Sequence, residues 1–236
     1  MSIRVSMLAA LAAVSVAGTA HAADLHTKAL PQPIQYVNYD PFSGPYVGVN
    51  VGYGWDLGNA SAAFQAVPIA NLSAAPQGFV GGFQAGYGYR FANVIYAGLE
   101  GDVDGANITG SATMPGLITT NSKNSWLASI RGEFGIIPVG HALLYGTVGW
   151  GWGGGSFTVQ DLTGRAALNA SASPTMDGFV WGGGVKFPLA QNWILGVKYL
   201  QYDFGSFNAA APAMPGLVFT QKDRVDVVRA ELNYKF

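Results

Sequence analysis

Residues 44–55 read GPYVGVNVGYGW, a stretch in which apolar residues alternate with glycine or a polar residue. The apolar set is Val47, Val49, Val51, Tyr53 and Trp55, and the alternate set is Gly48, Asn50, Gly52 and Gly54. Successive side chains of a β-strand point to opposite faces of the sheet. The stretch therefore predicts a strand with one apolar face and one face of small or polar side chains.

The same alternation returns along the chain and ends in VRAELNYKF at residues 228–236. Six further strands are predicted around residues 79–90, 95–103, 125–134, 144–152, 179–187 and 193–199. Long polar segments, at 56–77, 105–122, 153–177 and 206–221, alternate with tight turns near 92–93, 138–140 and 188–192. Long loops at one end and short turns at the other are typical of outer-membrane barrels. The predicted fold class is all-β, an eight-stranded antiparallel transmembrane β-barrel over residues 44–236.

The charged residues of the predicted strands share one face. They are Arg90, Glu100, Asp102, Asp104, Arg131, Glu133, Lys186, Lys198, Arg229 and Glu231, five of each sign. A water-soluble barrel carries its charges outside, whereas Lys or Arg facing hydrocarbon costs about 2–4 kcal/mol at the membrane midplane. The charge-free face is therefore expected to meet lipid, and the charges to form an ion network that fills the lumen. A solvated strand face and a proton or ion pathway are the alternative interpretations.

Aromatic residues gather near both ends of the apolar faces. Trp55, Phe79, Trp126 and Trp152 lie toward the long segments, and Tyr89, Phe134, Phe187, Trp193, Tyr234 and Phe236 lie toward the turns. Aromatic belts of this kind mark the two membrane–water interfaces of a barrel. The pattern thus predicts which part of each strand lies in the membrane.

The composition excludes several classes of protein. Only 11% of the 236 residues are charged, with 12 Lys and Arg against 13 Asp and Glu, so a nucleic-acid surface is not expected. The hydrophobic fraction of 50% argues against disorder. There is no cysteine, which removes disulfides and thiolate chemistry.

The first residues predict export. Residues 1–22 combine one charge, an apolar run at 7–17 and the small-x-small pattern before a cleavage between Ala22 and Ala23, as in a signal peptide. Residues 23–43 contain Pro31, Pro33 and Pro41 and are expected to form a periplasmic lead-in to the barrel.

Motifs of catalysis or cofactor binding give no assignment. The glycines at 149, 151 and 154 match a dinucleotide-binding spacing, but no helical period follows them. His26 lies in the lead-in and His141 at a predicted turn, so neither stands among the long segments. We therefore predict no catalytic, cofactor-binding or metal residue and no enzyme. Haem contact through His26, or through Tyr and Met side chains of the long segments, stays open as an alternative.

The predicted signal peptide, residues 42–55 (FSGPYVGVNVGYGW), residues 228–236 and the glycine–aromatic register at 78–87 together resemble a known family. The sequence is similar to the small outer-membrane β-barrel proteins of alphaproteobacteria, the immunogenic surface group of the OmpA-type and opacity-type superfamily. The resemblance implies an abundant cell-surface barrel that contributes to envelope integrity, with haem or host-molecule binding in some members. It also implies that Leu232, Tyr234 and Phe236 form the C-terminal signal for the barrel-assembly machinery.

The expected function is that of a non-enzymatic outer-membrane surface barrel with long extracellular loops available for binding. A narrow diffusion pore and a loop-borne receptor for haem or a host ligand are the alternatives. The expected partners are outer-membrane lipid, lipopolysaccharide and the barrel-assembly machinery, with no nucleic acid, and a monomer is expected.

Deleting Phe236, or replacing it with a charged residue, is expected to block outer-membrane insertion while export and leader removal continue. If Phe236 were only an interfacial ring, its loss would remove about 1.5–3 kcal/mol of burial, which a closed barrel should survive. Cell fractionation with a heat-modifiability gel separates the two roles. Normal amounts of folded protein in the outer membrane would refute the assembly role.

Overall fold

The computed structural model describes residues 40–57, 60–65, 67–72, 75–91, 94–138, 142–164, 169–210 and 217–236. They belong to one compact unit, Tyr39–Phe236. The regular secondary structure assigned in this part of the chain consists of strands. The described residues contain no helix that is long and apolar enough to span a membrane. The predicted signal peptide, the cleavage pair Ala22 and Ala23, both mature-chain histidines and the turn at 92–93 lie outside the described residues.

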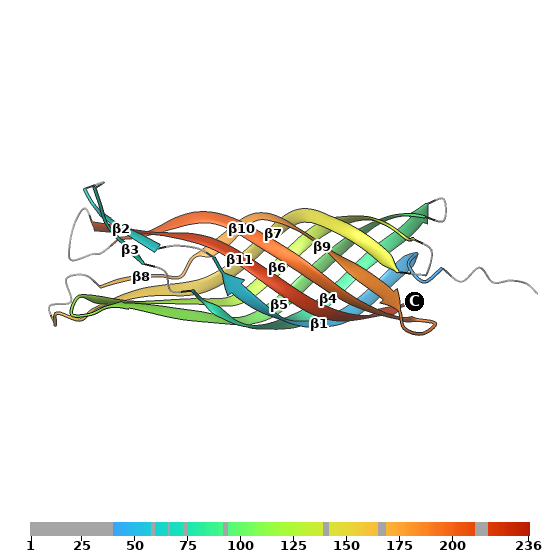
Figure 1. Ribbon diagram of the computed structural model, residues 1–236, viewed down its shortest axis with the longest axis horizontal. Coiled ribbons are helices and arrows are strands. Elements are labelled where there is room, and N and C mark those ends of the chain that lie inside the picture. Colours follow the sequence, from blue (N-terminus) through green and yellow to red (C-terminus); the bar gives the residue numbers. More distant parts are fainter. Residues whose placement is uncertain are drawn as a thin grey trace, which may run out of the picture. The chain divides into compact units, whose positions relative to one another are not determined.

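Eight strands of the described chain form a closed antiparallel ring (Figure 1). In ring order they are β1 (Gly44–Asp56), β4 (Gln77–Phe91), β5 (Ile95–Met114), β6 (Ile118–Ile136), β7 (Leu143–Asp161), β9 (Thr175–Pro188), β10 (Trp193–Ala210) and β11 (Leu217–Lys235). Each strand pairs with the next, and β11 pairs back with β1 from Tyr46↔Lys235 to Asp56↔Val225. The predicted antiparallel barrel is confirmed.

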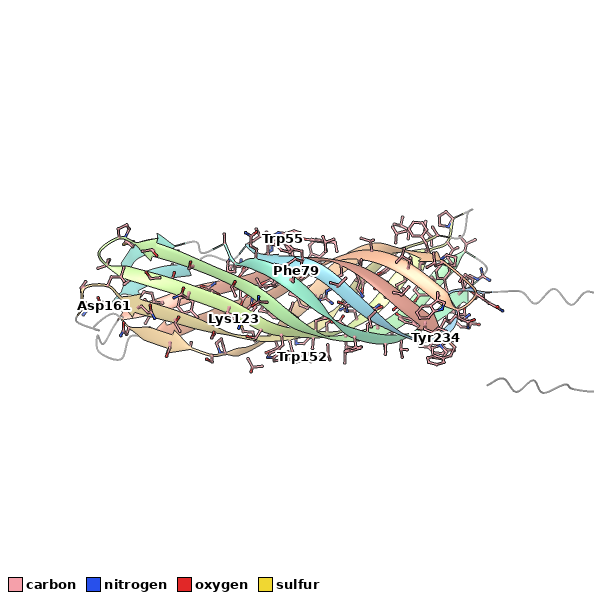
Figure 2. All side chains as sticks on the ribbon, turned by 90° about the horizontal axis from the view of Figure 1, so that it is seen from below. Trp55, Phe79, Lys123, Trp152, Asp161 and Tyr234 are labelled. Carbon is pink, nitrogen blue, oxygen red and sulfur yellow. The ribbon has the colours of Figure 1, made fainter. Side chains whose placement is uncertain are left out.

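The outward face of the ring is apolar and exposed, as the alternation predicted. Phe83, Val103 and Phe134 are 74%, 65% and 66% exposed, although each is a large apolar side chain. Figure 2 shows Trp55, Phe79 and Trp152 at a similar position along the barrel, with Tyr234 near the opposite end. We call the level of the first three the outer girdle and the level of Tyr234 the inner girdle. Between them the barrel presents a surface suited to hydrocarbon.

The long polar segments are not the irregular loops that the sequence suggested. Strands β5, β6 and β7 contain 20, 19 and 19 residues, whereas a strand needs about 9–11 to cross a membrane. Their extra residues continue as hairpins beyond the outer girdle, and three short strands, β2 (Ala60–Phe64), β3 (Val67–Leu72) and β8 (Ala170–Ala172), are added there. We call this end of the molecule the hairpin end.

The sheet changes register where it leaves the outer girdle. Register shifts occur between Gly105 and Ile108, between Asn124 and Trp126, and between Asp203 and Ser206. Bulges bend a strand and increase its local twist, and they are common at barrel rims. Beyond them β5, β6, β7 and β8 form one projecting sheet, while β10, β11, β2 and β3 form a second.

At the opposite end, the last residues of the lead-in belong to the barrel. Phe42 is buried and packs edge-on against Tyr96, with their ring centroids 6.5 Å apart. Asp40 accepts a hydrogen bond from Phe42 N and pairs with Arg90 at 3.2 Å. The end of the predicted lead-in therefore covers the bottom of the lumen.

Proteinase treatment of intact cells is expected to cut at residues 115–117 and 162–164, because these turns lie at the tips of the projecting hairpins. The turn at 189–192, which a hydrogen bond from Leu189 N to Trp193 O closes, should be cut only after the outer membrane is permeabilised. Mass spectrometry of the released peptides locates the cuts. Cleavage within 189–192 on intact cells would mean that the barrel has the reverse orientation.

Candidate functional site in the barrel lumen

Nine ionisable side chains meet inside the ring at mid-height, and we call them the lumen network. They are Glu100, Asp102 and Asp104 from β5, Arg131 and Glu133 from β6, Lys186 from β9, Lys198 from β10, and Arg229 and Glu231 from β11. Each is buried, because alternate residues of every strand point inward and the ring is narrow. Nine of the ten charged residues that the sequence analysis assigned to the lumen lie here, and the tenth is Arg90.

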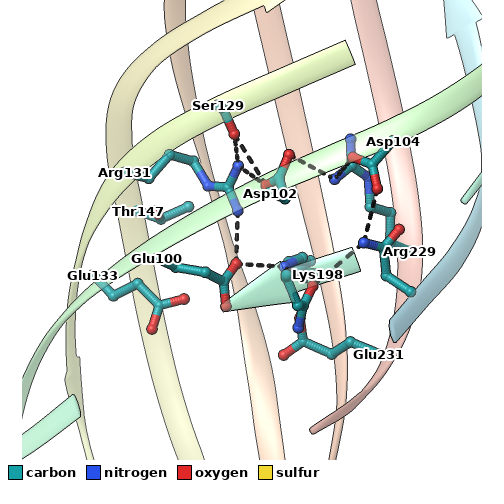
Figure 3. A network of polar contacts seen from close by, with 12 residues as sticks. Glu100, Asp102, Asp104, Ser129, Arg131, Glu133, Thr147, Lys198, Arg229 and Glu231 are labelled. Carbon is teal, nitrogen blue, oxygen red and sulfur yellow. Dashed lines mark hydrogen bonds and ion pairs between the residues drawn. The ribbon is translucent and has the colours of Figure 1, made fainter. Parts of the chain in front are cut away.

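Glu100 occupies the centre of the lumen network. Its Oε1 lies 2.7 Å from Arg131 Nη2 and 2.6 Å from Lys198 Nζ (Figure 3). Its Oε2 accepts a hydrogen bond of 2.8 Å from the Tyr46 hydroxyl and lies 3.4 Å from Lys186 Nζ. This carboxylate therefore ties together side chains from β1, β6, β9 and β10.

Two lysines hold the part of the network nearest the inner girdle. Lys186 Nζ lies 2.8 Å from Glu133 Oε2, which also accepts a hydrogen bond of 3.0 Å from the Tyr96 hydroxyl. Lys198 Nζ lies 2.7 Å from Glu231 Oε2, and Gln84 donates to the same oxygen at 2.9 Å. Each lysine thus bridges acids from different strands.

Two arginines hold the part nearest the outer girdle. Arg131 donates to Asp102 Oδ2, and Ser129 Oγ donates to the same oxygen at 3.0 Å. Arg229 Nη1 lies 2.6 Å from Asp104 Oδ2 and 3.4 Å from Asp102 Oδ1. Asn50 donates to Asp104 Oδ1 at 2.8 Å.

Arg90 does not join the lumen network, and its prediction as a member was wrong. It stands at the end of β4, where Asp40 of the lead-in reaches it before any lumenal acid can. Burial raises the pKa of Asp40, but hydrogen bonds from Ser43 and Phe42 and the charge of Arg90 outweigh it, so this pKa lies below its ordinary value. No sequence pattern indicated this pairing, because the lead-in lacks the alternation of a strand.

Apolar layers, which the sequence analysis missed, lie on both sides of the lumen network. Toward the hairpin end the layer consists of Val80, Ala106, Ile108, Leu127, Met176, Val180, Leu200, Tyr202, Phe204, Val225 and Val227. Toward the inner girdle it consists of Phe42, Tyr96, Ile137, Leu143, Tyr145 and Ile194. The alternation along each strand could have predicted these layers, since Leu200 and Tyr202 follow Lys198 at every second position and therefore also point inward.

Glycine makes room for the long side chains of the lumen. A Cβ at Gly86 would lie 2.4 Å from the Tyr46 hydroxyl oxygen, and a Cβ at Gly98 would lie 2.6 Å from that of Tyr96. Both hydroxyls bind network acids, so larger residues at either position would displace them. The inward glycines of the sequence are therefore complementary to the polar side chains.

The predicted assembly residues lie at the inner girdle, with Leu232 and Tyr234 on the outward face of β11 and Phe236 directly after its last residue. The Tyr234 ring packs edge-on against Trp193 and Phe236, with centroids 5.2 and 5.3 Å apart. Phe236 is 68% exposed. This place suits an interfacial ring, and the assembly role of Leu232, Tyr234 and Phe236 stays a prediction.

A closed antiparallel ring with an apolar exterior and an ion-paired interior defines a membrane-spanning barrel. Comparison with known families agrees, because the model for the outer membrane protein beta-barrel domain matches residues 7–236. The chain belongs to this family and is an outer-membrane protein.

Its curated relatives include the 31 kDa outer-membrane immunogenic proteins of Brucella melitensis and Brucella suis. Each is 30% identical over 243 residues, covering 98% of this chain and 99% of the relative. Among solved structures, OprG of Pseudomonas aeruginosa has a TM-score of 0.52 at 12% identity and covers 83% of this chain and 98% of its own. Ail of Yersinia pestis has a TM-score of 0.39 at 16% identity, covering 81% and 99%. The likeness to OprG shows the fold.

Replacing Lys198 with Met is expected to lower the free energy of unfolding by about 3–5 kcal/mol, because Glu100 and Glu231 lose a shared buried cation. Urea unfolding in lipid vesicles, followed by tryptophan fluorescence, measures the change. Lys222→Met is the matched control, since Lys222 is exposed beyond the outer girdle and its loss should change stability by less than about 0.5 kcal/mol. Equal effects of the two substitutions would contradict a structural role for the network.

Proposed function

We propose that this protein is a non-enzymatic, non-conducting barrel that contributes to outer-membrane structure and presents its hairpins for binding outside the cell. The observation that carries the proposal is the filled lumen. Nine charged side chains and two apolar layers occupy the space where a porin has water. The proposal places the hairpin end outside, as the alternation of long and short connections favours.

The layers argue against the alternative of a narrow diffusion pore. Leu127, Leu200 and Val227 have no exposed surface, and they lie beside the lumen network on the side of the hairpin end. A hydrated ion that crossed the barrel would have to separate these side chains and then break pairs such as Glu100–Lys198. Both steps are unfavourable, since apolar contacts and buried ion pairs would be lost together.

The same arrangement supports a non-enzymatic role. The polar groups of the lumen bind one another, and apolar side chains separate them from both ends of the barrel. A catalytic group must instead reach a substrate within hydrogen-bonding distance. Surface chemistry would have to come from the hairpins, which supply polar side chains such as Thr113 and Thr119, paired with each other at 3.1 Å.

Binding is assigned to the hairpins because they project past the outer girdle. The β5–β6 hairpin pairs as far as Met114↔Ile118, and β6–β7 as far as Ile118↔Asp161. Figure 2 shows Asp161 far beyond the level of Trp55. These sheets place side chains where a host molecule can reach them, held by backbone pairing to the barrel.

Purified, refolded barrel in planar bilayers is expected to give no steady channels, because the lumen has no continuous aqueous path. Heat-modifiability of the same sample verifies that it is folded. Channels of porin conductance would overturn the non-conducting role and favour the diffusion pore.

Haem titration followed by absorbance tests the receptor alternative. A structural barrel is expected to give no saturable shift of the haem absorption band. A saturable shift at one haem per barrel would instead favour a haem receptor, and its loss in a His26→Ala variant would place the haem ligand in the lead-in.

A further inference from the structure

The charges of the lumen network do not balance. It contains five acids, Glu100, Asp102, Asp104, Glu133 and Glu231, and four bases, Arg131, Lys186, Lys198 and Arg229. Arg90 would make the numbers equal, but it binds Asp40 at the end of the barrel. If all nine groups were ionised, the lumen network would hold one uncompensated negative charge.

The surroundings give that charge little compensation. All nine residues are at most 4% exposed, and apolar layers lie on both sides of them. Burying an unpaired charge is strongly unfavourable, and an acid in such a place is neutralised by a proton instead. The network is therefore expected to bind one proton.

The geometry selects the place of the proton. Asp102 and Asp104 are neighbours on the inward face of β5, and an oxygen of each carboxyl group approaches the same Arg229 Nη1 atom, Asp102 Oδ1 to 3.4 Å and Asp104 Oδ2 to 2.6 Å. Two ionised carboxylates placed around one guanidinium nitrogen repel each other, whereas a proton on one of them removes the repulsion and provides an O–H donor. Two carboxyl groups that share one site characteristically share one proton.

The two carboxylate oxygens that face Arg229 lack hydrogen-bond donors. Asp102 Oδ1 and Asp104 Oδ2 are buried and accept no hydrogen bond from the described residues. Both lie near Arg229 Nη1, which approaches Asp104 Oδ2 to 2.6 Å but is not aligned to donate a hydrogen bond. A proton between the two carboxyl groups would supply the missing donor.

The other groups around the pair are already engaged. Arg131 on β6 donates to Asp102 and Glu100, and Arg229 on β11 donates to the Tyr202 hydroxyl of β10 at 2.8 Å. Asn50 on β1 donates to Asp104, while the charges of Lys198 and Glu100 lie further along the network. Among the remaining acids, Glu231 Oε1 also lacks a donor, but it faces the Lys186 ammonium at 4.0 Å.

We propose that the Asp102–Asp104 pair is a proton-binding site in the lumen, occupied by one shared proton when the barrel is folded at neutral pH. The bound proton forms an O–H···O hydrogen bond between the two carboxyl groups and reduces the net charge of the lumen network to zero. This proposal concerns the lumen alone and holds whatever the hairpins bind.

Infrared spectroscopy of the full mature chain in lipid vesicles tests the proposal at pH 7. All samples carry Asp223→Asn, which removes a buried carboxyl near the hairpin end that could add its own signal. We expect the C=O stretching band of one protonated carboxylic acid per barrel. The band should shift when aspartate is labelled with ¹³C and should not shift when glutamate is labelled.

Asp104→Asn should abolish the band, because the amide replaces the shared proton with its own N–H donor and leaves four acids with four bases. Asp177→Asn, at an exposed carboxyl outside the lumen, is the matched control and should retain the full band. If Asp104→Asn fails to fold, the labelled parent still tests the proposal, because it must show a band and the band must come from aspartate. Absence of the band in the labelled parent, a shift on glutamate labelling, or survival of the band in folded Asp104→Asn would each overturn the proposal.

Discussion

A peptide group in hydrocarbon has no water to bind, and most features of this molecule follow from that constraint. An unpaired backbone N–H or C=O in the bilayer core costs several kcal/mol, so a sheet can cross only when it has no edge. Here the pairing of β11 with β1 over 11 residue pairs, from Tyr46↔Lys235 to Asp56↔Val225, removes the last edge. Once the ring closes, each strand must give alternate side chains to lipid and to a narrow interior.

The interior then sets its own requirement. An eight-stranded ring is just wide enough to be filled by side chains, and this one is filled in layers. Long charged side chains reach across the axis, and glycines at positions such as Gly86 leave them space. Replacing buried ion pairs with well-packed apolar residues is often neutral or stabilising, so the network is better understood as fixing which strands meet than as the source of stability. Glu100 illustrates this, since its partners come from four different strands.

The sequence predicted the barrel because period-two alternation is decided locally. Val47 and Gly48 take opposite faces whatever the rest of the chain does, so the lipid-facing and inward sets were correct. The sequence-based predictions were wrong where contacts with a distant segment determine the position of a side chain or the structure of a segment. The alternation places Arg90 on the inward face, but its side chain pairs with Asp40 of the lead-in, a segment without any alternation that could have predicted the pairing. The hairpin at residues 108–124 looked like a loop because its strands are polar, and each is held by pairing with the other rather than by an apolar face.

Side-chain contacts across the lumen were beyond sequence reasoning for a related reason. Parity shows that Lys198 and Glu231 both point inward, but which inward groups meet depends on the register around the whole ring. The register shifts at Gly105, Asn124 and Asp203 stand where the constraint of hydrocarbon ends. Between these shifts and the inner girdle, lipid and the filled lumen restrict nearly every side chain. Toward the hairpin end, water can form hydrogen bonds with the backbone, and only pairing within each hairpin restricts the sequence. The part of the chain that is free to acquire binding specificity is therefore also the part whose structure its sequence predicts least.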